Sequence, residues 1–164
     1  MAARKSAKRY WLVRSEPDVY SIDDLERDGS TCWDGVRNYQ ARNTLRDDMQ
    51  VGDGVLFYHS NAKPLAIVGV ARVSRAGYPD HTAWDPSTKY HDPKSDPKSP
   101  TWFMVDIEFV ARFRAPLCRE QLLEEEELAD MALLQKASRL SVQPVTPSEW
   151  RRVLQLAGAK VSLG

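Results

Sequence analysis

Cysteine is scarce in this chain of 164 residues, which contains Cys32 and Cys118 and no others. The two lie far apart and outside any CxxC spacing, so we expect neither a disulfide framework nor a zinc site. Scarce, unpatterned cysteine also favours a reduced compartment. We therefore expect the cytoplasm, and leave association with the nucleoid open.

Long hydrophobic runs are also missing. No stretch approaches the ~20 apolar residues that a membrane-crossing helix needs, and the basic start MAARKSAKRY has no apolar core of the secretory kind. We therefore expect no membrane partner. Residues 1–9, with Arg4 and Lys5, are predicted to form a flexible basic tail before a single domain at 10–158, and residues 159–164 to form a C-terminal tail.

An excess of charge of either sign is absent, because 23 Lys and Arg residues balance 23 Asp and Glu residues. A strongly basic chain would have indicated nucleic acid through its overall field. Any nucleic-acid surface here must therefore come from the local arrangement of residues, and strong nonspecific binding is not expected.

Familiar catalytic signatures are missing as well. The sequence has no GxSxG, HExxH or P-loop motif, and it lacks the HxE and PCxxC pair of zinc deaminases. The three histidines, His59, His81 and His91, form no strong nucleophile arrangement with a cysteine. We expect no catalytic residue, no metal and no cofactor.

Short elements of both kinds are present. Strand patterns occur at 10–14, 55–59, 65–73 and 102–113, an extended segment at 140–145, and helical patterns at 22–27, 36–48, 119–138 and 147–157. Residues 78–100 hold five of the ten prolines and predict a long surface loop with about one helical turn. Since no regular βαβ alternation appears, the pattern indicates an α+β domain with a small, curved antiparallel or mixed sheet.

Two of the helix starts are well marked. Ser21 is a good N-cap with Asp24 three residues later. Thr146 precedes Pro147 and is followed by Glu149, which predicts a capping box with proline in the first helical position.

Polar residues gather with aromatic ones at the ends of these elements, where sites on rigid sheets are usually built. The groups are Ser15 and Glu16; Trp33, Asp34, Arg37, Asn38 and Tyr39; Tyr58, His59 and Ser60; and Arg139, Leu140, Ser141 and Val142. Each residue taken alone also has a structural explanation. Trp33 could be core, for example, and Asp34 could cap the helix that follows.

These segments resemble the EVE domain, a branch of the PUA-like folds. YWLVRSEP at 10–17 is similar to the opening motif of that family, and WDGVRNYQARN at 33–43 to its second. GDGVLFYHS, GVARV, WFMVDIEF and RLSVQPVTPSEW follow in the order of the family. The resemblance spans nearly the whole chain, and WDGVRNYQARN is its most specific block.

The resemblance implies a small curved β-barrel or mixed sheet flanked by short helices, of the kind found in bacterial members. It also implies a pocket that accepts a flipped base in DNA or RNA, with 5-methylcytosine-type or related bases as the usual proposals. A non-catalytic reader of a modified base follows, working as a monomer or weak dimer.

The residues of the implied pocket take roles by their chemistry. Trp33 and Tyr58 are the candidate stacking surfaces, and Val36 and Leu140 could line a recess for a C5 substituent. Ser15, Asn38, Ser60 and the backbone near Ser141 could meet the Watson–Crick edge, and Glu16 could accept from an exocyclic amine. Asp34, Tyr39, His59 and Val142 complete the predicted site. Arg14, Arg37, Arg42 and Arg139 could meet flanking phosphates.

Two other interpretations stay open. One is an enzyme acting on a nucleotide or small ligand, with Glu16 or His59 as acid or base, and burial of Glu16 would support it. The other is a scaffold that binds protein partners through 78–100 and the acidic run at 124–127.

Overall fold

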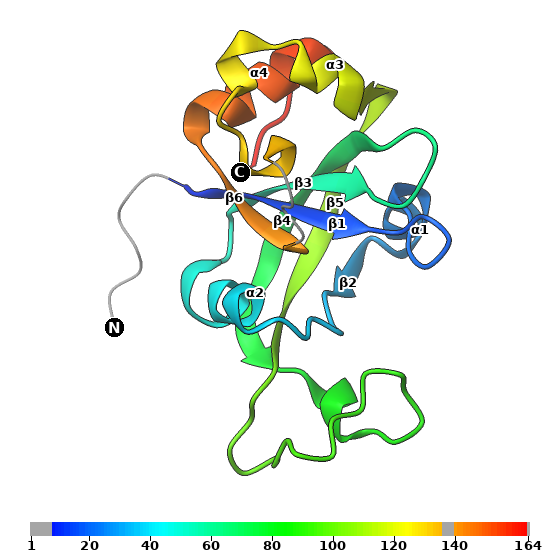
Figure 1. Ribbon diagram of the computed structural model, residues 1–164, viewed down its shortest axis with the longest axis vertical. Coiled ribbons are helices and arrows are strands. Elements are labelled where there is room, and N and C mark those ends of the chain that lie inside the picture. The colour runs from blue at the N-terminus through cyan, green and yellow to red at the C-terminus, as the bar shows by residue number, and fades with distance from the viewer. Residues whose placement is uncertain (1–7, 136–139, 164) are drawn as a thin grey trace.

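A curved six-stranded sheet forms the centre of the molecule in the computed structural model, which describes residues 8–135 and 140–163 (Figure 1). Its order is β2–β5–β4–β3–β1–β6. The strands are β1 (Tyr10–Ser15), β2 (Ser30–Cys32), β3 (Gly54–His59), β4 (Ala66–Pro79), β5 (Phe103–Cys118) and β6 (Val142–Val145). The predicted α+β class is confirmed, with an open sheet rather than a closed barrel among the described strands.

The sheet is mixed because β1 and β3 run parallel at its centre, while the other described pairs are antiparallel. β4 and β5 are the long strands, and their pairing shifts register at several points, first between Ile67 and Gly69. Such bulges bend a strand and increase its twist. The two long strands therefore carry the curvature of the sheet.

Two hydrophobic clusters cover the two faces of the sheet. Adjacent residues of a strand point to opposite faces, so Trp11 and Val13 of β1 join one cluster while Leu12 joins the other. In β3, Phe57 belongs to the first cluster and Tyr58 to the second. This alternation decides which strand residues can reach a site on one face.

Short helices and turns cover the sheet. They are α1 (Ile22–Asp28), α2 (Tyr39–Asn43), the π-helical turn η1 (Thr44–Asp48), the 3₁₀ turns η2 (His81–Trp84), η3 (Glu126–Leu128) and η4 (Ala132–Leu134), α3 (Arg119–Leu123) and α4 (Pro147–Ala157). Both predicted capping boxes are present, Ser21 with Asp24 and Thr146 with Glu149.

Two predicted helices differ in the structure. The helix expected at 36–48 begins at Tyr39, because Gly35 has a φ of 76° and Asn38 caps the helix by accepting from the Ala41 amide at 3.0 Å. The helix expected at 119–138 is broken into α3, η3 and η4, and residues 136–138 lie outside the described part. Its buried residues, Leu122, Leu128, Met131 and Leu133, would not share one face of a straight helix.

Strand boundaries differ as well. β2, for which the sequence pattern predicted no strand, ends just before Trp33 and pairs with β5, with Thr31 opposite Ile107. β4 and β5 extend beyond the predicted apolar runs to Pro79 and Cys118, because pairing between them continues through polar sequence, as between Tyr78 and Met104. Ladder hydrogen bonds do not depend on side-chain polarity, so composition alone could not give these ends.

The described part of the C-terminal segment lies on the second cluster, where Ala159, Val161 and Leu163 pack. Arg72 also donates to the Leu163 carbonyl at 2.7 Å. The basic residues Arg4 and Lys5 of the predicted N-terminal tail fall outside the described residues. Within the described residues, no helix is both long and apolar enough to cross a membrane.

Candidate functional site

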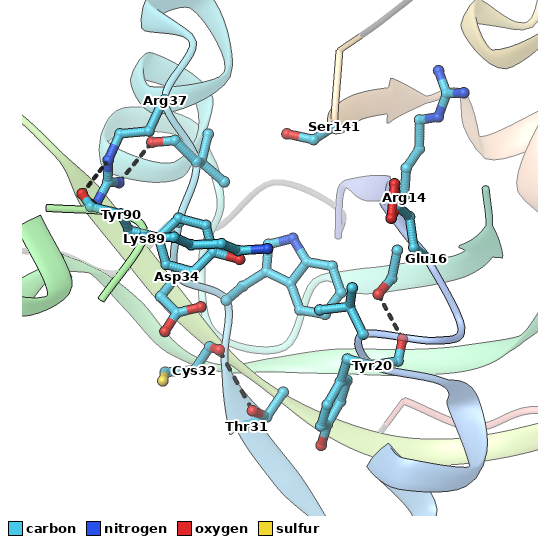
Figure 2. Close-up of a pocket in the computed structure, with 15 residues that line it drawn as sticks. Arg14, Glu16, Tyr20, Thr31, Cys32, Asp34, Arg37, Lys89, Tyr90 and Ser141 are labelled. Atoms are coloured by element: carbon cyan, nitrogen blue, oxygen red, sulfur yellow. Dashed lines mark hydrogen bonds between the residues drawn. The ribbon is translucent and has the colours of Figure 1, made fainter. Parts of the chain in front are cut away.

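A cavity of about 590 Å³ opens where the end of β1, the segment between β2 and α2, and the loop between β4 and β5 meet (Figure 2). Fifteen residues line it: Arg14, Ser15, Glu16, Val19, Tyr20, Thr31, Cys32, Trp33, Asp34, Gly35, Val36, Arg37, Lys89, Tyr90 and Ser141. Its volume is in the range of small-molecule sites.

The end of β1 and the turn after it form one wall. Ser15 donates from its hydroxyl to the Tyr20 carbonyl at 2.6 Å, and the Val19 amide donates to the Glu16 carbonyl at 2.9 Å. The Arg14 amide donates to the Ser141 carbonyl at 2.9 Å, which holds the segment before β6 beside β1. Residues distant in sequence thereby share one rim.

Trp33 is the aromatic ring fixed into the floor of the cavity. Its amide donates to the Val105 carbonyl at 2.7 Å, which ties it to β5. Its ring meets Phe57 edge to face, with centroids 5.6 Å apart and an interplanar angle of 81°. The side chain is 9% exposed. The sheet therefore fixes the orientation of the ring in advance of any ligand.

Arg37 fastens the loop between β4 and β5 to the cavity. Its five N–H groups donate to the Tyr90 carbonyl (3.1 and 2.7 Å), the Val36 carbonyl (3.0 Å), Asp80 (3.0 Å) and Thr82 (3.2 Å). A guanidinium has five donors, so all of them are engaged. Arg37 therefore acts as a structural clamp and has no donor left for a phosphate, which corrects its predicted role as a phosphate contact.

Asp80 is the buried anion that the clamp holds. Its carboxylate accepts from the Gly35 amide at 2.8 Å and the Thr82 amide at 2.9 Å, besides the Arg37 guanidinium. Burial alone would raise the pKa of Asp80, but the hydrogen bonds from Thr82, Gly35 and Arg37 outweigh burial and hold it below the ordinary value. Asp80 therefore ties the backbone at Gly35 to the start of the loop between β4 and β5.

Tyr90 and Lys89 bring the loop into the cavity. Figure 2 shows them across the cavity from Arg14 and Glu16. A Cβ at Gly35 would lie 2.6 Å from the Tyr90 ring, so the ring packs directly over the glycine. The absence of a side chain at position 35 therefore permits this wall.

Burial is the largest cause of the pKa shifts around the floor of the cavity. Burial, and then the nearby charge of Asp80, raises the pKa of Asp34. Burial, and then Asp34, raises the pKa of the Cys32 thiol. Burial and the hydrogen bond to Asp28 raise the pKa of Tyr20 to about 12. A ligand that donates a hydrogen bond to Asp34 would therefore offset part of the desolvation of this carboxylate.

Several predicted site residues meet at this cavity: Arg14, Ser15, Glu16, Trp33, Asp34, Val36, Arg37 and Ser141. The other predicted residues lie elsewhere. Asn38 and Tyr39 start α2 outside the lining, and Arg42 donates to the Thr101 carbonyl at 2.6 Å. Leu140 and Val142 pack in the first cluster, and Arg139 lies outside the described residues.

The predicted residues at the end of β3 do not line the cavity. Tyr58 is 1% exposed and packs in the second cluster, on the opposite face from Trp33, so it offers no stacking surface beside Trp33. The His59 Nε2 accepts from the Ile22 amide at 3.1 Å, and burial lowers the pKa of this imidazole. The Ser60 amide donates to the Ser15 carbonyl at 2.9 Å, so its described contact with the cavity wall is indirect.

Sequence reasoning missed the remaining lining residues, which are Val19, Tyr20, Thr31, Cys32, Gly35, Lys89 and Tyr90. The length of the proline-rich loop predicted a functional or mobile segment, but nothing in its composition singled out Lys89 or Tyr90. Their approach to Trp33 depends on a hydrogen-bonded clamp across more than fifty residues of sequence.

Comparisons with known proteins agree on one relationship. The family model described as the EVE domain matches residues 9–156. Mouse thymocyte nuclear protein 1 is 39% identical over 171 residues, which cover 93% of this chain and 75% of the relative.

Solved structures give the same result. A hypothetical protein from Leishmania major superposes with a TM-score of 0.89 at 46% identity, covering 94% of this chain and 98% of that one. The human THYN1 protein, solved in complex with DNA containing 5-methylcytosine, superposes with a TM-score of 0.87 at 37% identity, covering 93% of this chain and 99% of that one.

Proposed function

The chain belongs to the EVE-domain family, and from that membership we propose that it binds DNA by taking a flipped base of the 5-methylcytosine type into the cavity at Trp33. Binding occurs without chemical change to the base. The observation that carries the proposal is a fixed indole ring in the floor of a cavity of about 590 Å³. Because the human relative was solved in complex with DNA, we propose DNA rather than RNA as the nucleic acid that is bound.

The cost of flipping a base and the gain from stacking it on Trp33 are of similar size. Flipping a base out of a duplex costs a few kcal/mol, and less in a single strand or at a mismatch. Stacking on an aromatic side chain returns roughly 1–3 kcal/mol. Because Trp33 is already fixed by Val105 and Phe57, little conformational entropy is lost when the base arrives.

The polar lining supplies the selectivity. Asp34 and Glu16 can accept from the exocyclic amine of a cytosine, and the Ser15 hydroxyl lies on the same wall. Val36 offers an apolar surface where a C5 methyl group could pack. A carbonyl in place of the amine would face carboxylates, so we expect cytosine-type bases to bind in preference to thymine.

An oligonucleotide panel tests this function. Single strands with one central cytosine, 5-methylcytosine or thymine are titrated against the protein by fluorescence anisotropy, with matched RNA as competitor. We expect the methylated DNA to bind most tightly and Trp33→Ala to weaken that binding by roughly tenfold or more, as loss of one stacking partner requires. The matched control is Trp84→Ala, a partly buried tryptophan of η2 outside the cavity lining.

Binding that ignores the base, combined with an unchanged affinity of Trp33→Ala, would sink the proposal. The same panel separates the enzyme alternative, since mass spectrometry of the recovered oligonucleotides would detect an altered base. Burial of Glu16 would have supported that alternative, but Glu16 is exposed at the rim. The other candidate, His59, does not line this cavity.

A further inference from the structure

A continuous row of cations and aromatic rings leads from the cavity to the outer surface of α2. We infer that this row, the cation–aromatic ladder, binds the DNA strand beside the recognised base. The ladder consists of Lys89, Tyr90, Arg37, Trp102, Tyr39 and Arg42. The inference rests on the proposed function and adds to it a path for the flanking nucleotides.

The members of the ladder contact one another in sequence. The Lys89 Nζ lies 5.2 Å from the Tyr90 ring centre, and the Arg37 guanidinium carbon lies 5.7 Å from the same ring. Arg37 lies 5.3 Å from the ring of Trp102, whose centroid is 5.0 Å from that of Tyr39 with an interplanar angle of 28°. Because Lys89, Tyr90 and Arg37 also line the cavity, the ladder begins at its rim.

The inner rungs are rigid. The Trp102 indole donates to Asp92 at 2.7 Å, and Trp102 is 6% exposed. Arg37 uses all its donors within the protein. The buried part of the ladder therefore serves as a support, and ligand contact falls to its outer members.

The outer end of the ladder presents an aromatic ring beside one cation, while Lys89 lies at the cavity end. Tyr39 is 61% exposed and is the one aromatic ring among the exposed large hydrophobic side chains of the described residues. The Arg42 guanidinium carbon lies 5.0 Å from its ring. Within the part of the chain that the structure describes, neither Arg42 nor Lys89 has a carboxylate at ion-pair distance.

This chemistry fits a nucleic-acid strand. Successive bases stack on exposed aromatic rings and guanidinium planes, while cations beside them neutralise the phosphates. Tyr39 would stack a neighbour of the recognised base, Arg42 would meet the phosphate beside that neighbour, and Lys89 would meet a phosphate at the cavity rim. A chain with zero net charge can bind DNA through such a local track.

The test compares a short ligand with a long one. The probes are 5-methyl-2′-deoxycytidine monophosphate, which fills the cavity alone, and a single strand of about ten nucleotides with one central 5-methylcytosine, a length within known site sizes. Tyr39→Leu keeps apolar packing against Trp102 but removes the ring. The matched control is Leu123→Ala, an exposed apolar residue at the end of α3.

We expect Tyr39→Leu to weaken binding of the single strand by roughly tenfold, as loss of one stacked base predicts, with the affinity for the mononucleotide unchanged. Arg42→Ala should also weaken binding of the strand, and by a larger factor than it weakens binding of the mononucleotide, because Arg42 in addition holds the Thr101 carbonyl of the loop. An unchanged strand affinity in Tyr39→Leu and Arg42→Ala would overturn the inference.

The two proposals fail in distinguishable ways. If the ladder is wrong but the cavity reads a base, Trp33→Ala still lowers binding of both probes while Tyr39→Leu lowers neither. If the cavity does not read a base, neither the native protein nor any variant binds the mononucleotide, and methylation does not change the affinity for the strand. That result overturns the ladder as a path for the flank of a recognised base.

Discussion

Gly35 is a residue on which the shape of the cavity depends. Its φ of 76° lies in the left-handed region, which glycine adopts without steric cost, and the Tyr90 ring lies against its Cα. Gly29 has a similar φ of 79°, but a Cβ there would meet nothing within 4 Å. Comparing alanine substitutions at Gly35 and Gly29 therefore separates the effect of backbone strain from the effect of displacing the Tyr90 ring.

We expect Gly35→Ala and Gly29→Ala each to lose about 1–2 kcal/mol of unfolding free energy from the left-handed backbone. Gly35→Ala should in addition displace Tyr90 from the cavity wall, so that it alone weakens binding of the methylated strand. Urea unfolding and anisotropy titrations measure the two effects. Equal DNA affinity of the two variants would show that Tyr90 does not shape the site.

At the scale of elements, the segment 33–43 holds the loop between β4 and β5 in place at both ends of the loop. Arg37 binds the Tyr90 carbonyl and Asp80 near its start, and Arg42 binds the Thr101 carbonyl near its end. One short segment therefore both starts α2 and folds the loop onto the cavity. This accounts structurally for a sequence block that bears two arginines five residues apart.

Removing the clamp should be costly. Arg37→Ala leaves the fully buried Asp80 carboxylate without its cation, and breaking a buried pair in this way typically costs about 3–5 kcal/mol. Arg27→Ala removes an exposed pair with Asp24, which water and salt screen, so its cost should be far smaller. Denaturant unfolding at neutral pH measures both. A loss for Arg37→Ala as small as that for Arg27→Ala would contradict the clamp.

The start of α1 carries a pH-dependent contact. The His59 Nε2 accepts from the Ile22 amide, which requires an unprotonated nitrogen, and burial lowers the pKa of His59 below its ordinary value of 6.5. A lowered pKa in the folded state stabilises the protein above the unfolded pKa. That stability is lost as the pH falls through the lower folded value.

We therefore expect the thermal midpoint to fall as the pH is lowered from 7 through the region below 6.5. His59→Gln, whose amide oxygen can also accept, should remove that part of the pH dependence. The control is His91→Gln, in which an exposed loop residue changes. Parallel pH profiles for the native protein and His59→Gln would show that another group titrates.

At the scale of the whole molecule, the balanced charge predicts weak dependence of DNA binding on salt. The proposed phosphate contacts are Arg14, Lys89 and Arg42, and neutralising about three phosphates of a single strand gives a slope of log affinity against log salt of roughly −2. Titrations at several salt concentrations measure it. A slope near −5 would indicate a far larger basic surface than these residues provide.

Sequence patterns went furthest where local rules act. The capping boxes at Ser21 and Thr146 depend on residues three apart, and both are present in the structure. Sequence patterns were less informative where contacts distant in sequence set the ends of an element. Examples are the polar ends of β4 and β5 and the broken helical segment that begins at Arg119. Strand ends and helix breaks there follow the demands of the sheet and core.

The sequence by itself determined the α+β class, the family membership and several residues of the cavity, because ordered motifs and short-range periodicity are written along the chain. The tertiary structure alone decided which aromatic residues face the cavity. Because side chains alternate along β3, Tyr58 points into the second hydrophobic cluster, on the other face of the sheet. The hydrogen bonds of Arg37 hold Tyr90, and with it Lys89, at the cavity that Trp33 lines. Both depend on contacts between residues far apart in sequence.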